Sequence, residues 1–173
     1  MNKIIPCLPL VVGLFSISAF AADKPTDAQI AAIVVAANQV DIDAGKLAAS
    51  TSMDPKVKEF ANKMVTDHTS VNKSAVDLVT KLKVTPEANP TSKSLLDGGK
   101  KNLETLRALT GKAFDKAYVD HEVAYHEQVI AAIDTVLIPN AMNSELKALL
   151  VKVRPAFLEH LAHAKHLQSS LMM

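Results

Sequence analysis

Three of the six histidines of this chain lie close together near its C-terminus, at His160, His163 and His166 in the stretch AFLEHLAHAKHL. Neutral imidazole is a good ligand for transition metals, so such a group raises the question of a metal site. On a helix each residue turns about 100°, which places His163 about 60° and His166 about 120° from His160. Only His160 falls in the apolar seam of its helix, so the three histidines do not form one site.

The other long helical segments also carry an ionisable side chain at or beside their apolar stripe. Asp41 lies next to Val40, whereas His68 and His126 occupy stripe positions themselves. Counted along the helix axes from the hairpin turns, these three residues and His160 fall near the middle of a bundle of about 40 Å. Such groups are costly in an apolar core unless they are paired or bind a metal. We therefore predict that Asp41, His68, His126 and His160 converge as metal ligands.

Neighbouring side chains could orient these ligands or replace one of them: Asp67, Glu122, Glu159, His163 and Met64. A set rich in imidazole and poor in carboxylate suits zinc, copper, nickel or iron better than calcium or magnesium. The Glu-x-x-His pairs of di-iron bundle enzymes do not occur in this sequence. Haem needs only two axial ligands, which His68 with His160 or Met64 could supply, but the few aromatic residues and the large core side chains argue against it.

The same pattern has a second interpretation, in which buried histidines bond to aspartates across helices and only fix the register of the fold. Asp41 and Asp67 are available for that role. A third hypothesis is an enzyme that uses a bound metal, which ranks last because no general base or open metal site is evident. The leading interpretations are thus a metal-binding protein, for storage, buffering or stress protection, and a non-catalytic structural protein of the envelope.

The elements that must position these side chains are helical. The region after residue 22 is rich in Ala, Leu, Lys and Glu, and its apolar residues recur with the helical period. Thr26 with Gln29 forms a capping box, and Asp54 before Pro55 is a second N-terminal cap. We predict long helices over residues 26–50, 55–82, 112–137 and from 144 onward. Between them we expect a loop at 84–90, a shorter helix through 95–109 that Gly98-Gly99 weakens and Thr110-Gly111 ends, and a turn at 138–144.

Two hairpins of long helices, joined by the long segment 84–111, predict an all-α fold of the ferritin-like kind. This is a four-helix bundle with one long crossover connection, which here contains a short extra helix. A simple up-and-down bundle would not need that segment. Pro155 removes one hydrogen bond of the last helix, so we also expect a kink there. Residues 22–173 form a single domain in this interpretation.

The N-terminus predicts export. Residues 1–21 combine Lys3, an apolar run and an Ala-x-Ala pattern that ends at Ala21, which is typical of a cleaved secretory signal peptide. The single cysteine, Cys7, would leave with it, so no disulfide is expected. Removal of Lys3 leaves acidic and basic side chains in equal number, which does not favour a nucleic-acid partner, and no later segment is apolar enough to span a membrane. We expect a periplasmic or otherwise exported protein, and a homo-oligomer is compatible with the sequence.

Four stretches of the sequence resemble one known family: VDIDAGKLAA, VKEFANKMVTDH, FDKAYVDHEVAYHEQVI and RPAFLEHLAHAKHL. They look like the blocks of the domain-of-unknown-function family 4142, exported bacterial ferritin-like proteins often labelled predicted outer membrane proteins. The resemblance covers nearly all of residues 22–173 and implies a ferritin-like bundle and a periplasmic setting, without an established activity. In the family pattern the block Met64-x-x-Asp67-His68 and histidines like His126 and His160 recur. An acidic residue, often Glu, usually stands where Asp41 stands.

Overall fold

The structure, a computed structural model, describes residues 24–171, and no strand occurs among them. The elements in chain order are α1 (Asp27–Thr51), α2 (Pro55–Leu82), α3 (Pro90–Arg107), α4 (Gly111–Ala132), the π-helical η2 (Ile133–Leu137), α5 (Ile138–Asn140) and α6 (Ser144–Leu171). The all-α prediction is therefore confirmed for this part of the chain. The predicted signal peptide, residues 1–21, and Cys7 within it lie outside the described residues.

The predicted caps fix the beginnings of the first two helices. The Gln29 amide donates to the Thr26 hydroxyl at 3.2 Å, and the Thr26 amide donates to the Gln29 side chain at 3.2 Å, which is a complete capping box. The Asp54 carboxylate accepts from the Lys56 amide at 2.8 Å, directly before Pro55 opens α2. Both predicted starts are confirmed, because each cap satisfies amide groups that have no partner inside the helix.

The connection between α2 and α4 is more helical than the sequence indicated. The predicted loop ends one residue early, because Pro90 is the first residue of α3 and Asn89 is its N-terminal cap, accepting from the Ser92 amide at 3.0 Å. The Gly98-Gly99 pair lies inside α3 without a break. A Cβ atom on Gly99 would come within 2.8 Å of Val40 Cγ2, so the glycine lets α3 pack closely against α1.

The end of the fourth predicted helix differs from the prediction. The α-helical pattern ends at Ala132, residues Ile133–Leu137 form a π turn, and the predicted turn contains the short helix α5 before Ser144 opens α6. Pro139 has no amide hydrogen to donate into this segment, and the Thr135 hydroxyl donates to the Ala131 carbonyl at 2.7 Å. Both features disturb the regular ladder, and such disturbances favour a locally widened helix. α6 continues through Pro155, and the kink expected there stays a prediction.

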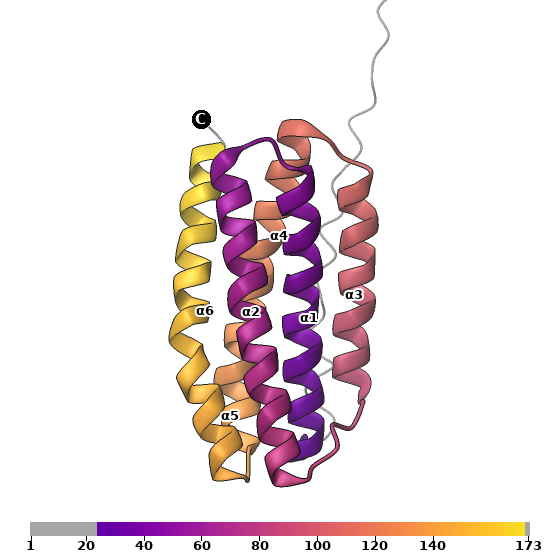
Figure 1. The fold of residues 1–173 in the computed structure, drawn as a ribbon, viewed down its shortest axis with the longest axis vertical. Coiled ribbons are helices and arrows are strands. Elements are labelled where there is room, and N and C mark those ends of the chain that lie inside the picture. Colours follow the sequence, from indigo (N-terminus) through magenta and orange to yellow (C-terminus); the bar gives the residue numbers. More distant parts are fainter. Residues whose placement is uncertain (1–23, 172–173) are drawn as a thin grey trace, which may run out of the picture.

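The long helices lie side by side with their axes roughly parallel (Figure 1). α1 packs against α2 and α3, α4 packs against α6, and α2 also contacts α6. α3 runs back along the outside of α1, so the chain enters α4 at the end of the molecule where α2 began (Figure 1). α2 and α4 therefore run in the same direction, and four helices can each present a side chain to one central layer.

The core consists of two apolar clusters stacked along the helix axes. The upper cluster, near the start of α2 and α4, includes Phe60, Met64, Phe114 and Tyr118. The lower cluster, near η2 and the start of α6, includes Phe157 together with Ile and Leu side chains of α1, η2 and α6. Between them lies a layer of buried polar side chains. None of the helices within residues 24–171 combines the length and the apolar character needed to cross a membrane.

Candidate metal centre

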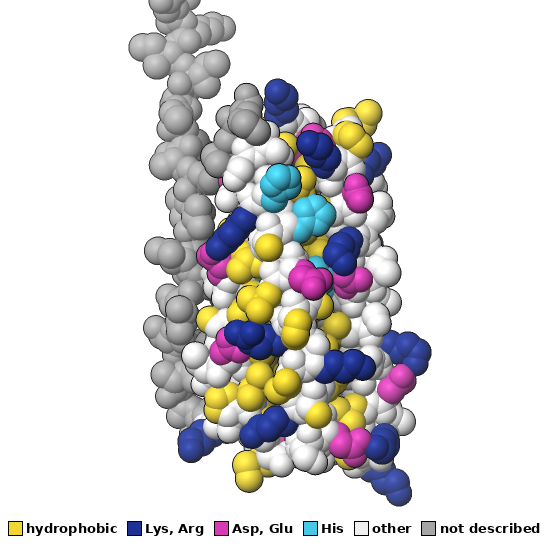
Figure 2. All heavy atoms as spheres, turned by 90° about the vertical axis from the view of Figure 1, so that its left-hand side faces the viewer, with side chains coloured by type: hydrophobic (Ala, Val, Ile, Leu, Met, Phe, Trp, Pro, Cys, Tyr) yellow, Lys and Arg dark blue, Asp and Glu magenta, His cyan; other side chains and the backbone are white. Residues whose placement is uncertain are grey.

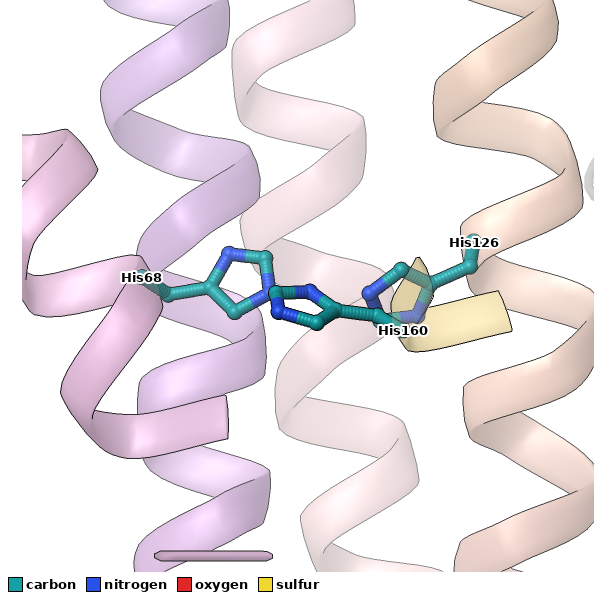
Figure 3. A group of neighbouring side chains, drawn as sticks. All are labelled: His68, His126 and His160. Atoms are coloured by element: carbon teal, nitrogen blue, oxygen red, sulfur yellow. The ribbon is translucent and has the colours of Figure 1, made fainter. Parts of the chain in front are cut away.

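Three buried imidazoles from three helices meet in the polar layer (Figure 3). His68 on α2 and His126 on α4 are each 1% exposed, and His160 on α6 is fully buried. One ring nitrogen from each lies within 4.8 Å of one from each of the others. The ring centroids are 5.1 Å apart for His68 and His160, 5.4 Å for His126 and His160, and 5.6 Å for His68 and His126. We call these three residues the histidine cluster.

Each imidazole of the cluster is held by one of its nitrogens. The three partners are all oxygen acceptors: His68 Nδ1 lies 2.8 Å from Asn38 Oδ1, His126 Nδ1 lies 3.0 Å from the main-chain carbonyl oxygen of Glu122, and His160 Nε2 lies 2.8 Å from Asp67 Oδ2. The Asn38 side chain is itself oriented, because its Nδ2 donates to the Val34 carbonyl at 2.7 Å. An oxygen that only accepts requires the hydrogen to sit on the bonded nitrogen.

The second nitrogen of each ring has no such partner. Within residues 24–171, His68 Nε2, His126 Nε2 and His160 Nδ1 are buried and make no hydrogen bond. Because the bonded nitrogens carry the hydrogens, these three nitrogens present lone pairs. Imidazoles that bind metals typically donate their other N–H to a carboxylate, a carbonyl or water in this way. The cluster therefore has the donor pattern of a metal-binding group.

Burial keeps these imidazoles neutral. It lowers the pKa of His126 to about 4, with the neighbouring His160 adding to the effect. Burial also lowers the pKa of His68 well below its usual value, and the pKa of His160 is lowered despite the opposing influence of the Asp67 carboxylate. The neutral form is the one that binds a metal, so the cluster is ready to bind at neutral pH.

Phe157 closes the cluster on the side of the lower apolar core. Its ring stacks on His68 with centroids 5.1 Å apart and an interplanar angle of 28°, and its centroid lies 6.2 Å from that of His126. A largely apolar cavity of about 110 Å³ lies between α1, α3, α4, η2 and α6. Both Phe157 and Asn38 line it, so the cavity adjoins the polar layer.

A second polar group adjoins the cluster. Asp41 on α1 is 2% exposed and Glu122 on α4 is fully buried, and with His126 they offer ligand atoms within 4.8 Å of one another. Glu122 Oε2 lies 3.6 Å from His126 Nδ1, and Asp41 Oδ2 lies 3.6 Å from His68 Nδ1. Burial raises the pKa of both carboxyls well above the usual range. We call Asp41 and Glu122 the carboxyl pair.

The structure divides the predicted ligand set. His68, His126 and His160 come together, but Asp41 faces the nitrogen of His68 that already bonds to Asn38. Asp41 therefore lies with Glu122 rather than among the three lone pairs.

The residues expected around the ligands lie at different places. Asp67 bonds to His160, and its side chain remains 31% exposed. Met64 is buried in the upper apolar cluster, Glu159 is exposed, and His163 is half-buried with its ring edge-on to Phe60 at a centroid distance of 5.0 Å. The face of the molecule on the α6 side shows histidine side chains in its upper half (Figure 2), and His166 of α6 is exposed.

Asn38 is the contributor that the sequence reasoning missed. It lies one helical turn before Asp41 between apolar residues of α1, and it is 2% exposed. The sequence did contain a signal for this role, because a polar amide at an inward-facing position of α1 indicates a hydrogen bond to another helix. Tyr125 behaves as expected for a core tyrosine, because its hydroxyl donates to the Ala37 carbonyl at 3.1 Å. Tyr118 does not, since its buried hydroxyl makes no hydrogen bond within the described part of the chain.

Comparison with known proteins identifies a family but no activity. The family model described as "Domain of unknown function (DUF4142)" matches residues 16–167, in agreement with the resemblance seen in the sequence blocks. No curated protein and no solved structure matches the chain.

Proposed function

The chain belongs to the DUF4142 family, and we propose that it binds one transition-metal ion through His68, His126 and His160. One observation carries this proposal. Three buried imidazoles turn unpartnered nitrogens toward one another, while the other nitrogen of each is held by an oxygen acceptor. An imidazole that only fixed the register of helices would be expected to find a partner for its second buried nitrogen as well.

The ligand chemistry narrows the class of metal. Neutral imidazole nitrogens suit zinc, copper, nickel or iron(II), whereas calcium and magnesium prefer oxygen ligands. Three protein nitrogens leave a coordination position for a further ligand. A single ion in a water-poor interior fits buffering or protection against free metal better than bulk storage. Haem finds less support, because Phe157 and the apolar clusters fill the space around the imidazoles.

The setting is part of the same proposal. The signal-peptide pattern of residues 1–21 supports export, and a periplasmic protein would meet metal ions before the cytoplasm does. The common direction of α2 and α4, with α3 in the long connection between them, supports the ferritin-like four-helix arrangement.

A structural role is the second candidate, and one observation favours it. Two of the hydrogen bonds that hold the imidazoles cross between helices, from α2 to α1 at Asn38 and from α6 to α2 at Asp67. Such bonds would fix the relative heights of three helices even without a metal. In that case the polar layer would specify the shape of a non-catalytic protein.

Metal content and variants separate the two candidates. The protein, purified without added metal or chelator, should contain a transition metal, measured by elemental mass spectrometry. After chelation, Zn²⁺, Cu²⁺ or Ni²⁺ should raise the melting temperature, because a ligand at a hundredfold excess over its Kd stabilises by about 2.7 kcal/mol. His68→Ala and His160→Ala should each remove one equivalent of bound metal, and the exposed His166→Ala is the matched control. If both variants lose stability while the wild-type protein binds no metal, the structural role is correct.

A further inference from the structure

We propose that the carboxyl pair, Asp41 and Glu122, is a second cation site, which adjoins the histidine cluster at His68 and His126. The two sites together would form a two-metal centre. That pairing rests on the proposed function, whereas the carboxyl site has its own supporting contacts.

The carboxyl pair consists of acceptors without donors. Asp41 Oδ1 and both carboxylate oxygens of Glu122 are buried and find no donor within the region that the structure describes, although Asp41 and Glu122 can hydrogen-bond to each other when one of them carries a proton. The two residues come from different helices, α1 and α4, and both side chains are almost completely buried. A carboxylate in such a place is very costly unless a cation or a proton compensates it.

No lysine or arginine supplies that compensation. Among residues 24–171, the groups within ion-pair range of the two carboxyls are His68 and His126, each at 3.6 Å. In each case the histidine nitrogen that faces the carboxyl already bonds to another oxygen, Asn38 Oδ1 for His68 and the Glu122 carbonyl for His126. Without a cation, Asp41 and Glu122 can become neutral only if each takes up a proton that carboxyls normally release well below pH 7. A divalent cation would compensate both.

Tyr118 gives an independent indication of a ligand. It lies one helical turn before Glu122 on α4 and is fully buried. Its hydroxyl has no partner within the described residues, although the nearby Tyr125 hydroxyl donates to the Ala37 carbonyl. The charges of Glu122 and Asp41 add to the effect of burial in raising the pKa of Tyr118, which agrees with a phenol oxygen beside the pair. Within the described residues, the unpartnered phenol of Tyr118 therefore lies one helical turn from Glu122 on the same side of α4.

The donor set indicates which ions fit. Two carboxylates and a phenol oxygen form an all-oxygen donor set, which suits hard divalent ions such as Mn²⁺ or Mg²⁺ better than copper. His126 stands between the two sites, with its unpartnered Nε2 in the histidine cluster and its Nδ1 3.6 Å from Glu122 Oε2. In the structure Nδ1 donates to the Glu122 carbonyl, so the oxygens hold the second ion without it.

Counting bound Co²⁺ tests the proposal, because this ion accepts both nitrogen and oxygen ligands. The metal-free protein is dialysed against Co²⁺ at neutral pH, and bound metal is measured for each variant after circular dichroism confirms its helix content. The wild-type protein should bind two equivalents. Asp41→Asn and His160→Ala should each bind one, and the double variant should bind none. Asp43→Asn is the matched control, because it makes the same change two residues away on α1 at a half-buried carboxylate that bonds to Gln39.

The outcomes distinguish this proposal from the proposed function. One equivalent that survives Asp41→Asn but not His160→Ala would overturn the second site and keep the histidine site. One equivalent that survives His160→Ala but not Asp41→Asn would keep the carboxyl site and overturn the histidine site. A single equivalent lost in both variants would mean one mixed site and would overturn the proposal of two. No binding in the wild-type protein would overturn both.

Discussion

The histidine cluster and the carboxyl pair are equally buried and lie side by side, yet they are satisfied in opposite ways. Each imidazole has one nitrogen held by an oxygen and one nitrogen free. The carboxyl pair has three oxygens without any hydrogen-bond partner within residues 24–171. An imidazole is neutral at pH 7 without a ligand and costs the fold little, whereas a buried carboxyl must either carry a costly charge or take up a proton. The histidine cluster can therefore remain without a ligand at little cost to stability, whereas the carboxyl pair destabilises the fold when no ligand is bound.

The direction of the pKa shifts follows from the same contrast. Burial lowers the pKa of the imidazoles and raises the pKa of the carboxyls, so both groups move toward their neutral forms. For the imidazoles the neutral form is already the common one at pH 7. For the carboxyls it requires uptake of a proton that an unfolded chain would not bind at that pH. At pH 7 the carboxyl pair, and not the histidine cluster, should therefore lower the stability of the metal-free protein.

The largest effect is expected at Asn38, which orients His68 through a buried hydrogen bond. Asn38→Ala removes the acceptor for His68 Nδ1 and leaves a buried N–H without a partner. Loss of such an orienting group typically lowers metal affinity by about 10- to 100-fold. An unpartnered buried donor also costs about 1–3 kcal/mol of stability.

Competition with a chelator for Zn²⁺ measures the affinity, and urea unfolding of the metal-free protein measures the stability. Gln39→Ala is the control, because Gln39 is adjacent on α1 but bonds to Asp43. Unchanged Zn²⁺ affinity in Asn38→Ala would show that the Asn38 amide does not orient His68 for metal binding. The contrast between an oriented histidine cluster and an unsupported carboxyl pair would then no longer hold.

A smaller effect of opposite sign is expected in the carboxyl pair. Glu122→Gln replaces a buried acid whose pKa is raised in the folded protein. A raised pKa gives stability that is present below the unfolded pKa of about 4.5 and is lost as the pH rises toward the folded value. The variant has no such loss, so the metal-free protein should be more stable than wild type by about 1–3 kcal/mol at pH 7.

The pH dependence checks the cause of that gain. As the pH falls below the unfolded pKa of about 4.5 the advantage of Glu122→Gln should vanish, since the wild-type acid becomes protonated in both states. The imidazoles, whose folded pKa is lowered, destabilise both proteins alike as the pH falls below about 6.5, so their contribution cancels in the difference. Urea unfolding at a series of pH values measures this difference in the free energy of unfolding between the variant and the wild-type protein. A constant gain at all pH values would mean that packing, and not charge, causes the effect.

The sequence predicted the parts of the molecule that depend on local rules. The caps at Thr26 and Asp54 and the helical periodicity gave the boundaries of α1 and α2, because these depend on neighbours a few residues away. The π turn at Ile133–Leu137 was not predicted, since it depends on how Pro139 and the Thr135 hydroxyl disturb one ladder. α3 extends through Gly98-Gly99 because close packing on Val40 outweighs the low helix propensity of glycine.

The candidate site shows the same limit. Periodicity selected His68, His126 and His160 as inward-facing residues of three helices, and the structure brings them together. Periodicity did not show that Asp41 lies apart from the three histidines. Helical angles indicate which residues face inward, but not which nitrogen of an imidazole ring a neighbouring side chain will face. The orienting role of Asn38 was missed for a similar reason. An amide signals its partner only through the contact it makes across helices, here with a residue 30 positions away.

The smallest effect is expected at the exposed edge of the histidine cluster. Asp67 holds His160 as Asn38 holds His68, but its side chain is 31% exposed and it also pairs with Lys63 at 2.7 Å. In Asp67→Asn the amide oxygen can still accept from His160, and water can reach the place of the lost charge. Metal affinity should fall by less than about tenfold, below the range expected for loss of an orienting group. The lost surface pair should cost about 0.5 kcal/mol or less. The same chelator competition and urea unfolding measure both values. A loss as large as that of Asn38→Ala would show that the carboxylate charge, and not the orientation of the ring, controls binding at this edge.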